Sequence, residues 1–241
     1  MERFIEIIGV MAWVFGPVLS FLHGLIQSYG LSIMLFTLLI KVLLYPLHAK
    51  QVKSQIKMSD MQPKIKEIQK KYGHDRQEMG AKMMELYKQE KFSPAGGCLP
   101  ALVQLPIIMG LFALLRNPMT FIEGDAMIIA ANESFLWISN LSQPDPWVLP
   151  VLAGITTYIS FSQTQAHQGA ALDGNPMMAS MMKMMKYFLP VMILVMGRTF
   201  PAGLTIYWFF GQFIQIFFNL HLNSVRKRLK AEAEFNKKNK K

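Results

Sequence analysis

The chain has 241 residues, of which 52% are hydrophobic and only 17% are charged, and its formal net charge is +10. Soluble domains average about 45–50% apolar and about 25% charged residues, so this composition favours a membrane protein. The single cysteine excludes an internal disulfide framework and a zinc site built from several cysteines.

Residues 1–29 form an N-terminal segment. Its apolar residues between positions 17 and 28 predict a helix that lies in the membrane interface and breaks at Tyr29-Gly30, because this stretch is too short and too poorly flanked for a clear span. The apolar stretch of Met1–Val14 follows no basic region, so no cleaved signal peptide is expected. A short uncleaved targeting segment is the alternative.

Five apolar blocks follow, each long enough, or nearly so, to cross a bilayer core, which needs about 20 residues. The fourth block depends on the methionine-rich run before it, and a tight turn must join it to the fifth. The predicted fold is therefore all-α: a polytopic membrane protein with five transmembrane helices, the first at 30–47 and the other four within 96–225. The blocks cover residues 30–47, 97–115, 147–163, 184–200 and 203–222.

The polar segment 48–95, between the first two spans, predicts a cytoplasmic helical hairpin. Gly73-His74-Asp75 separates its two halves as a helix stop followed by a helix start, and Pro63 suits a first helical turn. The methionine-rich faces of the two helices either bind varied partners, for which flexible methionine is suited, or simply pack on each other. The periodic apolar positions are Met61, Ile65, Ile68 and Tyr72, then Met79, Met83, Leu86 and Tyr87.

The positive charge is sorted between the apolar blocks. Residues 48–94 contain eleven basic and six acidic residues, and the stretch from 222 to the end contains eight basic and two acidic residues. By contrast, residues 116–146 contain one basic and four acidic residues. The positive-inside rule places both basic segments, four spans apart, on the cytoplasmic side. The sequence therefore predicts a multi-pass membrane protein with its N-terminus outside, its acidic loop outside, and a basic cytoplasmic tail at 226–241.

Lys41 is the most informative polar residue of the spans. A lysine at mid-span costs about 2.5–3.5 kcal/mol on insertion scales. No Asp or Glu occurs in the five blocks, so Lys41 has no carboxylate partner there, and an unpaired cation indicates water. Thr37 lies one turn earlier on the same helical face. The alternative is that Lys41 extends to the cytoplasmic surface as a positive-inside anchor.

Other spans also carry polar faces. Because polar groups that face lipid are costly, these faces are expected to turn toward one another and to enclose a hydrated cavity that opens inward. The alternative is that they only form hydrogen bonds between helices. The candidate residues are Lys41 and Thr37, with Gln104 from the second span, Ser160 and Gln163 from the third, and Trp208, Gln212 and Gln215 from the fifth.

Several enzyme classes lack their signatures. The spans contain no aspartate pair, HExxH and a P-loop are absent, and the five histidines show no metal-ligand spacing. We therefore expect no enzymatic activity, no metal and no cofactor. A small transporter or channel with Lys41 as a selectivity charge is the main alternative, although coupled transporters usually carry mid-membrane carboxylates and inverted repeats. A passive assembly scaffold is a second alternative.

Five blocks, taken in order, resemble the YidC family of membrane-protein insertases, in its short, Gram-positive-like form. Lysine stands at position 41, where that family usually has arginine. Relatives often carry glutamine near Ser160 or Phe161, whereas the nearest glutamine here is Gln163. The blocks are Leu38–Leu47, Met61–Ile65, Met84–Lys88, Ser93–Pro100 with Gln104 and Pro106, and Phe200–Leu204 with Tyr207 and Trp208.

The resemblance implies a membrane-protein insertase and chaperone of the bacterial plasma membrane that works without nucleotide hydrolysis. It adds Tyr207 to the candidate groove residues. It also implies that hydrophilic tails of nascent membrane proteins enter the groove and that their apolar segments are released to lipid. The implied partners are nascent membrane proteins, the ribosome through the basic tail, the Sec translocon and anionic lipids.

Overall fold

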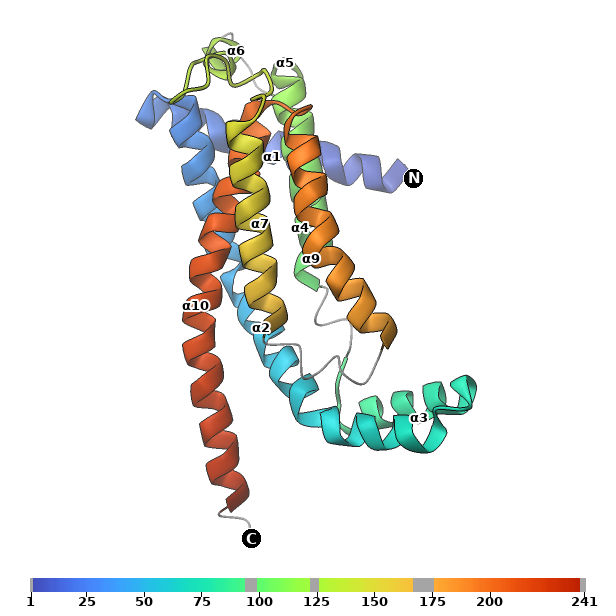
Figure 1. Cartoon of the computed structure of the whole chain (residues 1–241). Coiled ribbons are helices and arrows are strands. Elements are labelled where there is room, and N and C mark those ends of the chain that lie inside the picture. Colours follow the sequence, from blue (N-terminus) through green and yellow to red (C-terminus); the bar gives the residue numbers. More distant parts are fainter. Residues whose placement is uncertain (1, 94–98, 122–125, 167–175, 239–241) are drawn as a thin grey trace.

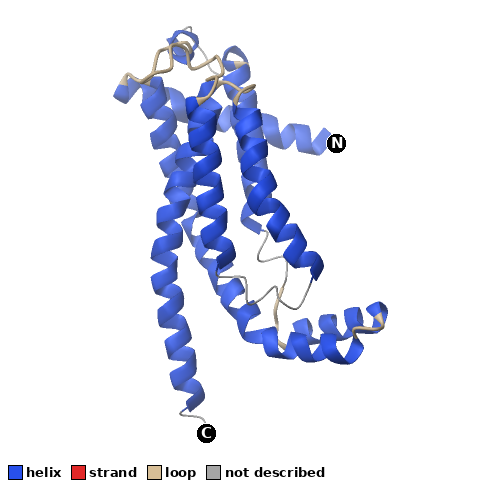
Figure 2. Cartoon of the chain, in the orientation of Figure 1, coloured by secondary structure: helices blue, strands red, loops and turns tan. Residues whose placement is uncertain are grey.

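The computed structural model describes residues 2–93, 99–121, 126–166 and 176–238. Within these ranges the regular secondary structure consists of helices, and a single isolated β-bridge pairs Phe135 with Ile138 (Figure 2). The prediction of an all-α fold is confirmed. Two helical segments among the described residues, Gly9–Ile26 and Tyr29–Met58, are long and apolar enough to cross a membrane, and Leu102–Arg116 is a shorter apolar segment. The number of five spans stays a prediction.

Five long helices run alongside one another (Figure 1). Helix α10 packs on α7 and α2, and α7 also packs on α9. Helix α1 (Glu2–Ile26) crosses this bundle and packs on α4 and α2. The long helices are α2 (Tyr29–Tyr72), α4 (Leu99–Arg116), α7 (Val148–Ala166), α9 (Pro176–Gly197) and α10 (Ala202–Lys238).

The bundle has two different ends. One end, here called the loop end, carries the short helices α5 (Pro118–Phe121) and α6 (Ala126–Ala131) and the connection 132–147 (Figure 1). The other, the hairpin end, carries α3 (Arg76–Gln89) and the C-terminal end of α10. The described parts of the acidic segment and the basic hairpin thus lie at opposite ends, in agreement with the charge sorting. Which end faces the cytoplasm stays a prediction.

Apolar side chains of α1, α2, α4 and α10 form the main core. Apolar burial is the principal favourable term in folding, and here it joins helices that are far apart in sequence. The core explains why α1 belongs to the bundle rather than standing apart as a separate N-terminal segment. Its fully or nearly fully buried members include Phe15, Leu19, Ile33, Phe36, Leu111, Leu114, Ile206 and Tyr207.

The boundaries predicted for the first helix are wrong. A single helix begins at Glu2 and ends at Ile26, whereas a helix at 17–28 was expected. The break falls at Gln27-Ser28 instead of Tyr29-Gly30, and Gln27 has a positive φ of 54°. Ser28 occupies the N-cap position of α2 in an extended conformation, but its side chain makes no capping hydrogen bond.

Glu133, from the connection at the loop end, supplies the missing cap. The backbone N–H of Tyr29 donates to Glu133 Oε2 at 2.9 Å, and His23 Nε2 lies 2.9 Å from Glu133 Oε1. A carboxylate at a helix N-terminus satisfies a free N–H group and interacts favourably with the helix dipole. This distant carboxylate explains why the chain turns before Tyr29, since the helix starts where its first donor finds an acceptor.

The same connection caps two more helices. Asp145 Oδ1 accepts hydrogen bonds from the backbone N–H groups of Trp147 (2.9 Å) and Leu149 (3.3 Å) at the start of α7. The first N–H groups of α10 donate to backbone carbonyls, from Ala202 to Gln143 (2.9 Å) and from Gly203 to Leu141 (3.1 Å). Residues 132–147 therefore bind the N-termini of α2, α7 and α10 together.

We expect Glu133→Ala to lower the stability of the protein by about 1–2 kcal/mol, which is the usual cost of a lost helix cap. Hydrogen exchange should accelerate at the first amides of α2, because their acceptor is gone. Gln143→Ala is the matched control, since its side chain is exposed and its capping carbonyl belongs to the backbone. Equal exchange rates in the two variants would contradict this role of Glu133.

Helix α2 joins the predicted first span to the hairpin without interruption. It runs from Tyr29 to Tyr72, so the division between residues 47 and 48 is not a helix end. The placement of Pro63 in a first helical turn is wrong, because Pro63 and Pro46 both lie inside α2. Each proline removes a backbone donor and favours a bend, and the helix turns toward α3 in this region (Figure 1).

The hairpin buries the predicted apolar faces against each other. Met61, Ile65 and Leu86 are buried at its centre, and Met58, Ile68, Met83, Tyr87 and Phe92 pack around them. Asp75 caps α3 by accepting hydrogen bonds from the N–H groups of Gln77 and Glu78. Of the methionines of the hairpin, Met61 is thus buried, Met58, Met79 and Met83 are half-buried, and Met84 is exposed.

Leu86→Ala is expected to destabilise the hairpin by about 2–3 kcal/mol, through lost burial and the cavity that it leaves. The measurement is the hydrogen-exchange protection of the α3 amides. Met84→Ala, an exposed position on the same helix, is expected to change stability by less than about 0.5 kcal/mol. The same loss of protection in both variants would show that Leu86 is not the centre of the hairpin core.

The remaining boundaries agree with the predicted blocks to within a few residues, with two extensions, at the start of α9 and at the end of α10. The tight connection between α9 and α10 is confirmed at Arg198–Pro201, and α9 includes the methionine-rich run. Helix α10 continues through the predicted tail as far as Lys238. Residues 94–98 of the block Ser93–Pro100, including Cys98, lie outside the described residues.

Candidate functional site

A small polar cavity lies between α2, α4 and α10. Its volume is about 20 Å³, which is room for about one water molecule. Five of the nine predicted site residues line it, and Gly211 completes the wall. The expected groove is therefore a narrow cavity in this structure. The lining residues are Lys41, Gln104, Tyr207, Trp208, Gly211 and Gln212.

Lys41 is buried in this wall, with 6% of its surface exposed. A Cβ atom at Gly211 would lie 3.3 Å from Lys41 Cε and 3.6 Å from Thr37 Cγ2, so the glycine makes room for the lysine side chain. Lys41 makes no hydrogen bond or ion pair with any residue that the structure describes. An unpaired cation inside an apolar bundle is costly, and such residues usually mark a functional pathway.

Thr37 lies beside the cavity but directs its hydroxyl elsewhere. Its Oγ1 donates to the carbonyl of Ile33, one turn earlier on α2, at 2.6 Å. The side chain is fully buried, and only its methyl group approaches Gly211. Thr37 therefore shapes the wall without offering a free hydroxyl.

Tyr207 and Trp208 are neighbours that connect α10 to two different helices. Gln104 Nε2 donates to Tyr207 Oη at 2.6 Å, which links α4 to α10. Trp208 Nε1 donates to Thr157 Oγ1 at 2.9 Å, which links α10 to α7. The hydroxyl of Thr157 in turn donates to the carbonyl of Ala153 at 2.7 Å. These bonds fix two walls of the cavity.

Two other predicted residues, Ser160 through its backbone carbonyl and Gln215 through its side chain, belong to a second polar cluster between α7 and α10. Asn219 Nδ2 donates to the carbonyl of Ser160 (3.3 Å) and approaches Thr164 Oγ1 (3.4 Å), while Gln215 Nε2 donates to Asn219 Oδ1 (3.1 Å). Position 219 is eight residues beyond Gly211, or about 12 Å nearer the hairpin end at 1.5 Å per residue. Gln215 Oε1 and Gln163 Oε1 are buried and accept no hydrogen bond from a described residue.

The structure thus divides the predicted set in two. Lys41, Gln104, Tyr207, Trp208 and Gln212 line one cavity, with Thr37 beside it, whereas Ser160 and Gln215 belong to the second cluster. Gln163 is half-buried next to Thr164 on α7, with its Oε1 atom buried.

The predicted site residues did not include Thr157 and Gly211, whereas Asn219 lies on the predicted polar face of the fifth span with Trp208, Gln212 and Gln215. The sequence predicts a polar face of the third span through Thr156, Ser160 and Gln163. This face is offset by one residue, because the hydroxyl of Thr156 bonds to its own helix and Thr157 faces α10. The spacing of Thr157, Ser160 and Thr164 was an equally good helical face. Gly211 lies on the face of α10 shared with Tyr207 and Gln215. A glycine on a polar helical face indicates that another helix approaches closely there, and this signal could have found it.

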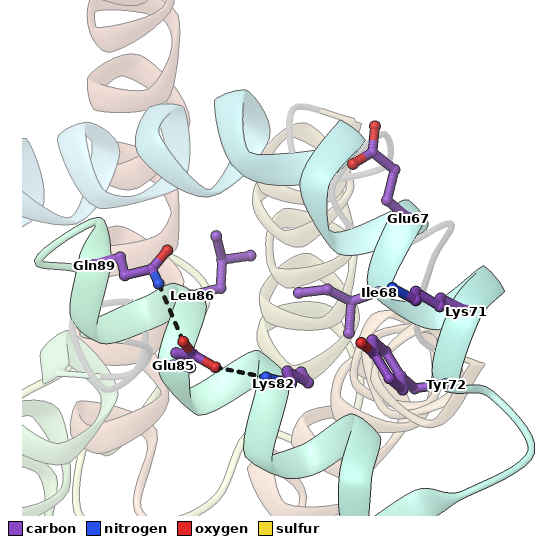
Figure 3. A pocket seen from close by; sticks show the side chains of 8 residues that line it. All are labelled: Glu67, Ile68, Lys71, Tyr72, Lys82, Glu85, Leu86 and Gln89. Carbon is purple, nitrogen blue, oxygen red and sulfur yellow. Dashed lines mark hydrogen bonds and ion pairs between the residues drawn. The ribbon is translucent and has the colours of Figure 1, made fainter.

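A second pocket, of about 330 Å³, lies between α2 and α3 in the hairpin (Figure 3). Its charged groups pair along α3, since Glu85 accepts hydrogen bonds from Lys82 (3.1 Å) and Gln89 (3.3 Å). The hydrogen bond to Glu85 raises the pKa of Lys82, and a hydrogen bond from Lys64 lowers the pKa of Glu90. Burial raises the pKa of Tyr87. The lining consists of Glu67, Ile68, Lys71, Tyr72, Lys82, Glu85, Leu86 and Gln89.

Comparison with known proteins finds consistent relatives. The family model described as "60Kd inner membrane protein" matches residues 21–230. The membrane protein insertase YidC of Shewanella halifaxensis is 40% identical over 212 residues, which cover 86% of this chain and 36% of that protein. The same-named protein of Francisella tularensis subsp. novicida is 39% identical over 200 residues, covering 83% of this chain and 33% of that protein.

A solved structure is also similar. The crystal structure of an active YidC insertase with its first transmembrane domain resolved superimposes with a TM-score of 0.60 at 29% sequence identity. The similarity covers 85% of this chain and 44% of that one. The chain spans about a third of the length of the curated relatives that it matches.

Proposed function

Because this chain belongs to the 60Kd inner membrane protein family, the family of the YidC insertases, we propose that it inserts nascent membrane proteins into the bacterial inner membrane. The observation that carries the proposal is the buried, unpaired Lys41 in a polar cavity between α2, α4 and α10. Neither a purely structural core nor a bundle joined only by hydrogen bonds benefits from such a cation.

The cavity lowers the cost of bringing a hydrophilic tail below the membrane surface. The tail of a substrate enters from the hairpin end, which the charge sorting makes cytoplasmic, with the C-terminus inside and the N-terminus outside. Lys41 and the amide groups of Gln104 and Gln212 offer charge and hydrogen bonds to acidic or polar residues. The apolar segment of the substrate then partitions into lipid, and this hydrophobic transfer drives the step without nucleotide hydrolysis.

The cavity of about 20 Å³ is too small for a polypeptide, so the helices around it must separate when a substrate enters. The hydrogen bond from Gln104 to Tyr207 is the direct polar contact between α4 and α10 at this point, and replacement of that bond by substrate contacts would open the wall. The second cluster, around Asn219, offers buried acceptors nearer the hairpin end, where an arriving tail meets them first.

The cytoplasmic partners follow from the same orientation. The positively charged tail at 226–241 is placed to contact ribosomal RNA beside an emerging chain, and anionic lipid headgroups are its alternative acidic ligands. The hairpin receives the substrate, and the Sec translocon is a further partner.

Reconstitution tests the function directly. The purified protein in proteoliposomes, supplied with a single-span substrate and no ATP, should insert the substrate well above the level of protein-free liposomes. Insertion at the protein-free level would refute the proposal. Solute or ion flux through the protein without any nascent chain would instead favour a channel with Lys41 as its selectivity charge.

A further inference from the structure

The connection that caps three helices also exposes an apolar and aromatic rim at the loop end. The rim consists of Leu136, Trp137 and Trp147. Asp145 holds its two tryptophans: Trp137 Nε1 donates to Asp145 Oδ2 at 2.7 Å, and the backbone N–H of Trp147 donates to Oδ1. Both indole side chains remain half exposed, at 50% and 55%.

Leu136 occupies the tip of a tight turn in an unfavourable way. The turn is closed by reciprocal hydrogen bonds between the backbones of Phe135 and Ile138, at 2.8 and 2.9 Å. Leu136 adopts a left-handed conformation with φ 54°, which costs a non-glycine residue about 1–2 kcal/mol. The result of this strain is that 76% of an apolar side chain is exposed. The cost of exposing the side chain is removed if Leu136 lies in an apolar medium, and that gain offsets the backbone strain.

Arg198 adds a cation to the rim. It follows the last residue of α9, and its guanidinium carbon lies 3.9 Å from the ring centroid of Trp147. Arg198 is exposed and forms no ion pair with a residue in the described part of the chain. A guanidinium that lies on a ring face keeps the N–H groups of its own plane free, and these match a phosphate in a bidentate geometry.

The rim is continuous with the apolar outer surface of the bundle. Val148 and Ile155 on α7 and Val191 and Val195 on α9 are all more than half exposed. In a membrane protein these side chains face the acyl chains of lipids. Trp147 and Arg198 stand at the loop end of that surface, the depth at which tryptophan and arginine meet the headgroup layer.

We propose that Arg198 binds the phosphate of a phospholipid in the leaflet at the loop end, with Trp137 and Trp147 at the level of the lipid carbonyls and Leu136 inserted among the acyl chains. This site is distinct from any binding of anionic lipid by the basic segments at the hairpin end. It attaches the connection that caps α2, α7 and α10 to the membrane surface.

The test measures the depth of Leu136 in vesicles. After Cys98→Ser, a nitroxide is attached at Leu136→Cys, and its accessibility to oxygen and to a water-soluble nickel chelate is compared. In phosphatidylglycerol–phosphatidylcholine vesicles the label should favour oxygen severalfold. A label at Gln143→Cys, an exposed position of the same connection, should favour the chelate. Equal preference for the chelate at both positions would overturn the insertion of Leu136.

The test of phosphate binding by Arg198 compares phospholipids with a lipid that has no phosphate. Arg198→Gln should make the label at position 136 severalfold more accessible to the chelate in phospholipid vesicles, but not in vesicles of digalactosyldiacylglycerol. Lys183→Gln removes the same charge from an exposed site at the opposite end of α9 and should have no effect. An equal effect of Arg198→Gln in both vesicles would assign Arg198 to packing and overturn its phosphate role.

A free anion is the remaining source of phosphate. Millimolar inorganic phosphate, added to the detergent-solubilised protein, should leave the label at position 136 unchanged, because a lipid headgroup is bound together with its acyl chains. A change of the label that requires Arg198 would identify a site for free phosphate and overturn the lipid assignment.

Discussion

Lys41→Glu is expected to abolish the insertion of substrates whose translocated tail is acidic, whereas Lys41→Arg retains it. The substitution places a carboxylate in a wall whose other lining residues carry no positive charge, and it repels the acidic tail. An acidic residue of the tail at mid-span costs about 2.5–3.5 kcal/mol unless a cation compensates its charge. Loss of the Lys41 cation should therefore slow insertion by about 100-fold. The measurement is the yield of inserted substrate in proteoliposomes.

Two comparisons make this result specific to the cavity. A substrate of the same length with a neutral tail should lose much less insertion in Lys41→Glu. Lys183→Glu makes the same charge change at an exposed position and should act like the parent protein. If Lys41→Ala and Lys41→Glu both support full insertion of acidic tails, the cation of the cavity is not part of the mechanism.

Gly211→Leu is expected to stop insertion of acidic and neutral tails alike. The first carbon of the new side chain would lie 3.3 Å from Lys41 Cε and 3.6 Å from Thr37 Cγ2, and three further carbons would have to enter a cavity of about 20 Å³. Overpacking of this kind costs about 1–3 kcal/mol and fills the space that a substrate needs. Insertion of both substrates and the melting temperature in detergent are measured together.

The controls separate closure of the cavity from a general loss of the fold. Gly211→Ala adds only a carbon that the flexible end of Lys41 can accommodate, so it should retain most activity. Gly24→Leu adds the same leucine to α1, at a position where no neighbouring atom lies within 4 Å of the new Cβ. This variant should fold and insert both substrates like the parent protein. Full insertion by a folded Gly211→Leu protein would show that substrates do not pass this cavity.

Charge sorting and helical periodicity predicted much of the architecture. The apolar blocks became helices of the bundle, and the spacing of Met61, Ile65 and Leu86 predicted which faces the hairpin buries. The same kind of evidence selected Lys41 and Gln104, which line one cavity. Such patterns succeed because one helical face depends only on neighbours within a few turns of the same segment.

Periodicity does not predict which other helix a polar helical face will contact. Gln212 and Gln215 lie on one side of α10, yet Gln212 lines the cavity of Lys41 while Gln215 bonds to Asn219 in another cluster. The break before α2 was predicted two residues too late for a similar reason, because the cap of this helix, Glu133, is 104 residues away from Tyr29 in sequence. These features depend on how distant segments pack, and a single sequence contains no local signal for that.

Because α2 is uninterrupted, it connects the hairpin mechanically to the cavity wall. Its 44 residues extend over about 66 Å at 1.5 Å per residue, with Lys41 in the half next to the loop end and the hairpin core in the other. A load that tilts the hairpin is therefore transmitted along one helix to Lys41. Pro46 lies between the two parts and lacks a backbone donor, so α2 bends most easily there. A tilt of the hairpin about this position would shift the cavity wall that contains Lys41.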